Sequence, residues 1–203
     1  MQRVFLRTAQ WQEHHGIQVS ATALRRAVQA AAVEKVFAAL DLLHAYAPAQ
    51  LARIPSYMHG IAVTPLQNAL GTWLRSLGMR LLDDAYIVAD HTSPEDVAAT
   101  IVHELTHARL ERAGVRYVGP SRARCERICF LAERNWASRL PASPYRDALD
   151  ARIARYLAIP AEHWSDAAMA QRVARKRVAW PWWQRAIYVV GQFLREVRGL
   201  RAP

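Results

Sequence analysis

The segment that most constrains the fold is residues 93–114, because both of its ends carry helix signals. Ser93 is a favourable N-cap residue, Pro94 fits the first helical position, and Asp96 completes a Ser-x-x-Asp variant of the capping box. Gly114 provides a C-terminal stop. The sequence therefore predicts one helix with defined ends, apolar on one face and polar on the other.

The polar face of this helix carries His103-Glu104-Leu105-Thr106-His107, an HExxH sequence. Histidines four residues apart lie one turn apart on the same face, so both imidazoles can bind one metal ion. Glu104 is rotated by about 100° from His103, which sets its carboxylate beside the ion rather than on it. We therefore expect a Zn²⁺ site with His103 and His107 as ligands and Glu104 as the general base of a hydrolase.

A catalytic zinc site needs a third protein ligand and an open position for water. The next predicted helix offers two carboxylates, Glu126 and Glu133, which are seven residues apart on one face. They lie about 10 Å apart along the helix axis, so both cannot easily reach one ion. Glu133 is a ligand, an acceptor for a histidine ligand, or a salt-bridge partner of nearby arginines. Cys125 and Cys129 are soft donors on the same helix, although we expect them to be small buried residues with free thiols.

An HExxH sequence followed by a glutamate from a second, downstream helix resembles the gluzincins, the thermolysin-like zinc metallopeptidases. The resemblance covers residues 86–140, and the chain is also similar to small bacterial HExxH proteins of uncharacterised function. The resemblance implies that Glu126 is the third ligand, because it follows His107 at about the family's usual spacing. Phe130 stands where the family usually has an aspartate. The resemblance therefore identifies no hydrogen-bond partner for the histidine ring nitrogens that do not bind the metal.

The activity that the resemblance implies is zinc-dependent hydrolysis of a peptide or protein substrate. A donor to the developing oxyanion is also expected, and Tyr117, Arg122 and Arg124 are the candidates. The rival hypothesis is a non-catalytic, zinc-stabilised binding module that acts at a membrane surface or on nucleic acid through its basic C-terminal region. A toxin or processing factor that cleaves a single partner is a third hypothesis.

The remaining chain predicts an α+β fold, predominantly helical, with a small β-sheet and a helical C-terminal part. Apolar spacing and proline positions predict helices at residues 20–46, 66–77, 121–140 and 143–157, followed by a basic helical stretch to residue 178. Apolar β-type residues predict strands at 54–64 and 115–118 and a strand or hairpin at 79–89, while residues 1–19 are assigned no element. Residues 86–89 are either an edge that holds an extended substrate or an ordinary core strand.

The length of 203 residues fits one zincin-like domain over residues 1–178, followed by an amphipathic helix over residues 179–203. Trp183, Ile187 and the apolar residues that follow them at helical spacing form one stripe. We expect this stripe to dock on the domain, and peripheral membrane contact through the same helix is the alternative.

The net charge of +10 would normally indicate an anionic partner. Only Lys35 and Lys176 are lysines, however, and the arginines are spread along the chain in the manner of a coding bias. No nucleic-acid-binding motif occurs, so nucleic acid is not an expected partner. The two cysteines and the lack of a secretory apolar run at the N-terminus indicate the cytoplasm.

Overall fold

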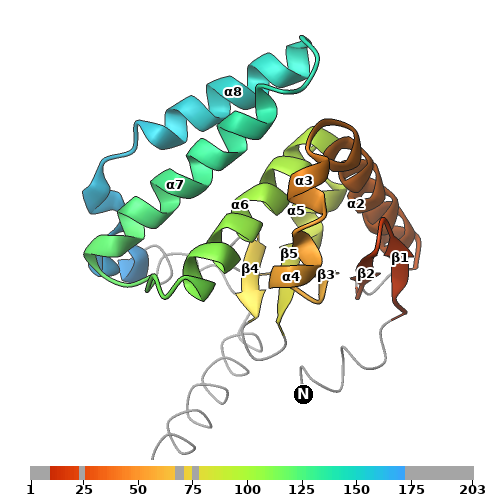
Figure 1. Cartoon of the computed structure of the whole chain (residues 1–203), viewed down its shortest axis with the longest axis horizontal. Coiled ribbons are helices and arrows are strands. Elements are labelled where there is room, and N and C mark those ends of the chain that lie inside the picture. Colours follow the sequence, from red (N-terminus) through yellow and green to blue (C-terminus); the bar gives the residue numbers. More distant parts are fainter. Residues whose placement is uncertain (1–9, 23–25, 67–70, 75–77, 172–203) are drawn as a thin grey trace, which may run out of the picture.

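A small mixed sheet supports the helices (Figure 1). The computed structural model describes residues 10–22, 26–66, 71–74 and 78–171. Its strands are β1 (Gln12–His14), β2 (Ile17–Ala21), β3 (Gly60–Thr64), β4 (Gly71–Leu74) and β5 (Met79–Asp83). They lie in the order β1-β2-β3-β5-β4, with the three central strands parallel and the two edge strands antiparallel to their neighbours.

The helices form most of the described chain, which confirms the predicted α+β, predominantly helical class. They are α2 (Arg26–Tyr46), α3 (Pro48–Leu51), α4 (Ile54–Tyr57), α5 (Asp84–Val88), α6 (Pro94–Arg112), α7 (Pro120–Ala137), α8 (Pro144–Leu157) and the 3₁₀ helix η2 (Ala161–Trp164). Helix α6 packs against both α2 and α7, and α8 runs alongside α7 on the outer side (Figure 1). The central position of α6 makes it the helix around which the others are arranged.

Alternation along the central strands divides their side chains between two faces. Ile61 and Val63 of β3 join the main core, which extends from β2 to α8, whereas Ala62 lies in a smaller cluster with Leu81 of β5. Leu82 of β5 also joins the main core. Because residues two apart in a strand share a face, Arg80 is turned towards the main core and α6 as well.

Helix α6 has the ends that its sequence predicts. The Asp96 backbone N–H donates to Ser93 Oγ at 3.2 Å, and the Ser93 backbone N–H donates to the Asp96 carboxylate at 3.0 Å, so the capping box is complete. Gly114 follows the helix with a φ of +80°, a left-handed conformation that favours glycine. The apolar face is buried, with Ile101 and Val102 almost fully covered. Strong local signals therefore position the HExxH sequence.

The predictions for the later long helices are confirmed to within a few residues, since α7 occupies most of 121–140 and α8 occupies 144–157. The prediction of a helix over 20–46 is correct only from residue 26, because Ser20 lies in β2. The unassigned residues 1–19 include β1 and the start of β2, which form a hairpin.

Two predictions between residues 54 and 77 were wrong in part or whole. Residues 54–57 form the short helix α4, with Pro55 in its first turn, and the strand begins only at Gly60. The predicted helix over 66–77 contains strand β4 instead, because Gly71–Leu74 pairs with β5 along its length. Cross-strand pairing outweighs the helical spacing of the apolar residues in this segment.

The predicted strand or hairpin at 79–89 is strand β5 followed by helix α5. The Asp83 carboxylate caps α5 by accepting the Tyr86 backbone N–H at 3.3 Å. Residues 86–89 therefore cannot be a substrate-binding edge, and the edge strand that packs against α6 is β4. Residues 115–118 form no strand, since they are exposed and pair with none of the strands described above.

After α8 the described chain continues through η2 and a helical turn at residues 166–171. The rest of the predicted basic stretch and the amphipathic helix at 179–203 lie outside the described residues. Among the helices of the described residues, none combines the length and apolar character that crossing a membrane requires.

Candidate metal centre

The two histidines of α6 converge on one point. Nε2 of His103 lies 3.0 Å from Nε2 of His107, and the rings meet edge to face. Two ligand atoms of a tetrahedral zinc ion are separated by about 3.3 Å when each bond is about 2.0 Å long. The separation of the two nitrogens is therefore close to that of atoms that share a metal ion.

Glu126 of α7 completes this arrangement. Its Oε2 lies 3.4 Å from Nε2 of His103, and its Oε1 lies 3.4 Å from Nε2 of His107. The side chain is buried and comes from the helix packed beside α6. Two imidazoles and one carboxylate facing the same point are a donor set that fits zinc, and Glu126 has the position predicted for the third ligand.

Glu133 lies behind His103 rather than in front of it. Its Oε1 is 2.5 Å from Nδ1 of His103, and Glu133 as a residue is 5% exposed. A carboxylate that accepts the Nδ1 proton leaves the lone pair of Nε2 directed at the metal position. Glu133 is therefore the hydrogen-bond partner of Nδ1 of His103. The ring of Phe130 packs edge to face on His103.

The charges of this cluster are coupled. Burial lowers the pKa of His103, but hydrogen bonds with Glu126 and Glu133 outweigh burial and raise the pKa to about 9. Burial lowers the pKa of His107, and the hydrogen bond with Glu126 only partly opposes this effect. Burial raises the pKa of Glu126, but the hydrogen bonds from both histidines outweigh it and hold that pKa well below its usual value. A metal ion entering the cluster would therefore displace a proton from His103.

Cys129 is the nearest rival ligand. Its sulfur lies within 4.8 Å of the ligand nitrogens of His103 and His107. Burial, and the negative charge of Glu126, raise the pKa of the Cys129 thiol, so the thiol is protonated at neutral pH. Zinc binds the thiolate and would have to displace this proton, whereas the Glu126 carboxylate is already ionised. Cys125 and Cys129 are both buried and free, as predicted.

Glu104 is buried beside a cation that no sequence motif marks. Its carboxylate forms an ion pair with Arg80 of β5, and Arg80 is only 1% exposed. Burial lowers the pKa of Arg80 to about 9, so it is still charged at neutral pH. The backbone of β4 passes closely, since a Cβ added at Gly71 would lie 3.0 Å from Oε1 of Glu104. The alternation of side chains between the two faces of a strand was the only sequence signal that could have shown Arg80 to be buried.

Of the three candidate oxyanion donors, Tyr117 is the one at the metal centre. Its hydroxyl donates a hydrogen bond to Oε1 of Glu126, and its ring packs edge to face on His107 at 5.1 Å. Arg122 lies over the Tyr117 ring and is ion-paired with Asp166 at 2.7 Å. Arg124 is exposed and does not line the cavity described next.

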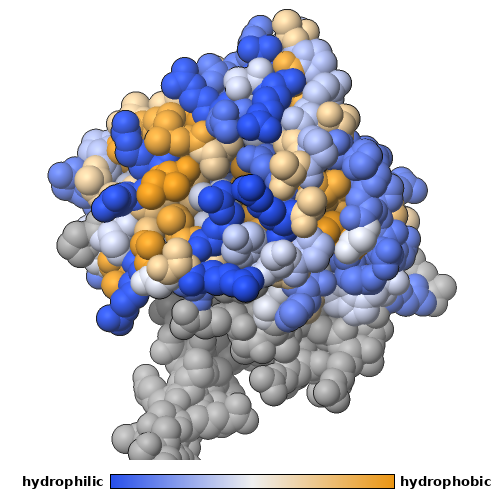
Figure 2. Space-filling model, viewed as in Figure 1, coloured by the Kyte–Doolittle hydropathy of each residue, from blue (hydrophilic) through white to orange (hydrophobic). Residues whose placement is uncertain are grey.

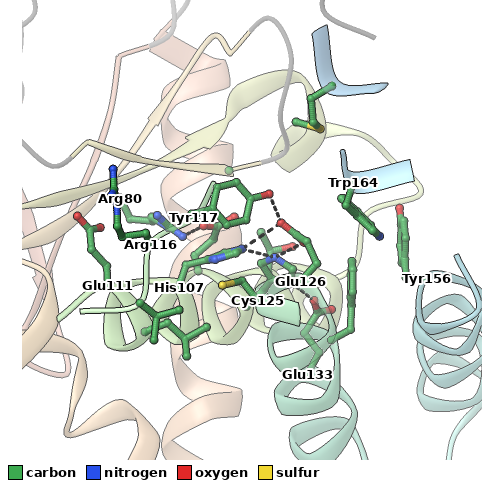
Figure 3. A pocket seen from close by; sticks show the side chains of 18 of the residues that line it. Arg80, His107, Glu111, Arg116, Tyr117, Cys125, Glu126, Glu133, Tyr156 and Trp164 are labelled. Carbon is green, nitrogen blue, oxygen red and sulfur yellow. Dashed lines mark hydrogen bonds and ion pairs between the residues drawn. The ribbon is translucent and has the colours of Figure 1, made fainter. Parts of the chain in front are cut away.

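A cavity of about 930 Å³ opens onto these residues. Figure 3 shows Tyr117 above Glu126, and Tyr156 and Trp164 on the opposite wall. That wall is aromatic, since Phe130 stacks on Tyr156 with ring centres 4.7 Å apart. On the face drawn in Figure 2, hydrophobic side chains gather on the side of α7 and α8, between hydrophilic ones. The site therefore combines a polar centre with an apolar wall.

Comparisons with protein-family models, with curated proteins and with solved structures find no match to this chain.

Proposed function

We propose that this chain is a zinc-dependent hydrolase of the metallopeptidase type, with His103, His107 and Glu126 as zinc ligands. The observation that carries the proposal is the convergence of the two Nε2 atoms and both Glu126 oxygens on one point, within distances of 3.0–3.4 Å. Glu133 supports it by holding Nδ1 of His103. The likeness of these residues to the gluzincin pattern makes peptide bonds the proposed substrate.

When bound, zinc supplies a water of lowered pKa and polarises the carbonyl to be cleaved. Glu104 follows the first histidine on the same helix, and we assign to it the role of taking the proton from that water and passing it to the leaving amine. Its pairing with Arg80 restricts where the carboxylate lies. Gly71 leaves room for this arrangement, because a side chain there would meet the Glu104 carboxylate.

Tyr117 is the proposed donor to the oxyanion. Tyr117 is 40% exposed as a whole residue, but burial around its hydroxyl, and the charge of Glu126, raise the pKa of that hydroxyl, so it keeps its proton at neutral pH. In the structure the Tyr117 hydroxyl donates this proton to Glu126. If Glu126 bound zinc, the ion would balance the charge of the carboxylate. The Tyr117 hydroxyl could then donate its hydrogen bond to a substrate oxygen.

The proposed substrate is a peptide or protein, entering the cavity between Tyr117 and the aromatic wall. The free, buried thiols of Cys125 and Cys129 support a reducing compartment, so we propose the cytoplasm as the location. Peripheral membrane contact through residues 179–203 belongs to the same proposal, although these residues lie outside the described part of the chain.

A second candidate function is a zinc-stabilised binding module without catalysis, acting at a membrane or on nucleic acid. One observation favours it: the carboxylate of Glu104 is already paired with the buried Arg80. A general base must contact the attacking water, so a permanent pair with Arg80 would leave Glu104 with a purely structural role.

The experiment that separates these functions is Glu104→Gln in the zinc-loaded full chain. We expect the variant to bind zinc at the same stoichiometry as the wild type. It should no longer cleave a proteome-derived peptide pool, with cleavage monitored by mass spectrometry. Glu95→Gln, in the first turn of the same helix, is the control and should cleave like the wild type. Equal cleavage by Glu104→Gln and wild type would reject Glu104 as the base. No cleavage by the wild type, with salt-sensitive binding to anionic vesicles or DNA, would favour the binding module.

A further inference from the structure

A second cluster of ligand-type side chains lies on elements that the proposed zinc centre does not use. Nε2 of His14 and Nε2 of His15 lie 2.7 and 2.8 Å from the same oxygen of Asp41. The histidines belong to the β1–β2 hairpin, and Asp41 belongs to α2. The three ligand atoms all lie within 4.8 Å of one another. Two imidazoles and a carboxylate therefore meet between two separate elements.

The backbone of the hairpin makes this convergence possible. His14 is the last residue of β1 and pairs with Ile17, so His15 and Gly16 form a two-residue loop. Their φ angles are +50° and +76°, as a tight hairpin turn of this kind requires. Consecutive residues of an extended strand would point to opposite faces, whereas the turn allows both imidazoles to reach one carboxylate. His15 is the only non-glycine residue with a left-handed φ in the described part of the chain.

Each imidazole is also held by a ring on α2. The ring of His14 stacks on Phe37 with centres 4.4 Å apart, and the ring of His15 stacks on His44 at 4.3 Å. Phe37, Asp41 and His44 are spaced by four and three residues and so share one face of the helix. The hairpin and the helix thus hold both rings with their Nε2 atoms directed at Asp41.

The donor set is suited to a transition-metal ion. The Asp41 carboxylate is exposed and faces both imidazoles, and it offers a charged oxygen of the kind that binds metal ions. Imidazole and carboxylate together suit Zn²⁺, Ni²⁺ and Cu²⁺ rather than Mg²⁺ or Ca²⁺. Spreading the ligand atoms from hydrogen-bond distance to about 3.3 Å would make room for zinc. The Asp41 side chain is 59% exposed, so it can shift without disturbing buried packing.

We propose that His14, His15 and Asp41 form a second metal site that binds a zinc-class divalent ion and clamps the β1–β2 hairpin to α2. Water fills the remaining positions of the ion, because the cluster lies at the surface. This site is independent of the zinc centre on α6 and α7, and its role is structural: bound metal replaces two shared hydrogen bonds by coordinate bonds between the same two elements.

The test is calorimetric titration of the full chain with Zn²⁺ in the variant His103→Ala/His107→Ala, which removes both histidines of the α6 centre. The proposal expects one zinc ion to bind per chain and to raise the thermal unfolding midpoint. Adding His14→Ala and His15→Ala should abolish both the heat of binding and the shift in midpoint. A failure of the proposed hydrolase function would not change either result, so the two proposals fail separately.

Asp41→Asn is the second variant, because it keeps the size and exposed position of the side chain while removing its charge. It should weaken zinc binding at least tenfold in the same background and leave the zinc-free unfolding midpoint near that of its parent. His91→Ala is the matched control, as it removes an exposed histidine outside the cluster. Unchanged zinc binding after loss of His14, His15 or the Asp41 charge would overturn the proposal, and so would the absence of any zinc binding in the starting variant.

Discussion

Replacing Glu133 by glutamine tests the carboxylate behind the zinc centre. Glutamine keeps the length of the side chain and a carbonyl acceptor, but it removes the negative charge that lies 2.5 Å from Nδ1 of His103. Two consequences oppose each other. The imidazole loses the partner that fixes its tautomer and raises its basicity as a ligand, while the proton that competes with zinc becomes easier to remove.

The sizes of these effects follow from the site. Loss of a carboxylate partner of a histidine ligand costs roughly 10–100-fold in metal affinity. With a His103 pKa of about 9, proton competition weakens zinc binding by about 100-fold at pH 7 in the wild type and only about twofold at pH 9. Without the charge of Glu133 the pKa of His103 should fall, although Glu126 still raises it. Protons then compete less strongly with zinc for His103 at pH 7. The affinity deficit of the variant should therefore be small at pH 7 and reach the full 10–100-fold at pH 9.

The assay is a competition titration with a chromophoric zinc chelator at both pH values, using wild type, Glu133→Gln and the exposed control Glu162→Gln. It is carried out with His14→Ala and His15→Ala in all three proteins, so that only the α6 centre is measured. Zinc affinity of Glu133→Gln equal to that of the control at pH 9 would refute the role of Glu133. A deficit of equal size at both pH values would refute the coupling to the proton on His103.

Three further predictions concern stability. Arg80→Met should lower the free energy of unfolding, measured in urea, by roughly 3–5 kcal/mol, because it leaves the buried Glu104 carboxylate without its partner. Adding Glu104→Gln should restore part of this loss. An unchanged free energy of unfolding in Arg80→Met would contradict a buried ion pair. Ser93→Ala should lower the free energy of unfolding by about 1 kcal/mol, whereas Ser93→Asp, which keeps a capping side chain, should lower it much less. Equal losses of unfolding free energy in the two variants would contradict the role of Ser93 as the N-cap. In the metal-free protein the folded pKa of His103 is about 9 against an ordinary value of 6.5, so its stabilisation is complete below pH 6.5 and is lost as the pH rises towards 9. The urea midpoint should fall between pH 7 and pH 9, and His103→Gln should flatten that slope; a wild-type midpoint that stays constant over this range would contradict the shift.

The helix that carries the HExxH sequence was predictable because its signals are local. The cap at Ser93 and Asp96 and the glycine stop lie within a few residues of the ends they define, and all of them are present in the structure. Helices α7 and α8 were predictable for the same reason, since Gly119-Pro120 and Ser143-Pro144 mark where they begin.

The parts that could not be predicted depend on contacts between distant segments. The helix predicted over 66–77 rested on the spacing of its apolar residues, whereas Gly71–Leu74 within it pairs with β5 as strand β4. In the sequence Arg80 is a single charge in an apolar strand, and its ion pair with Glu104 depends on how the sheet and α6 are brought together in the fold. The choice between Glu126 and Glu133 required the relative rotation of α6 and α7, which brings one carboxylate to the Nε2 atoms and the other to Nδ1 of His103.

An anomalous difference map recorded at the zinc absorption edge from crystals of the zinc-loaded protein would locate the metal ion directly. We expect a peak within about 2.0–2.2 Å of Nε2 of His103, Nε2 of His107 and a carboxylate oxygen of Glu126, with Glu133 still on Nδ1 of His103. A peak bound by Cys129 or Glu133 in place of Glu126, or no peak between α6 and α7, would contradict this expectation.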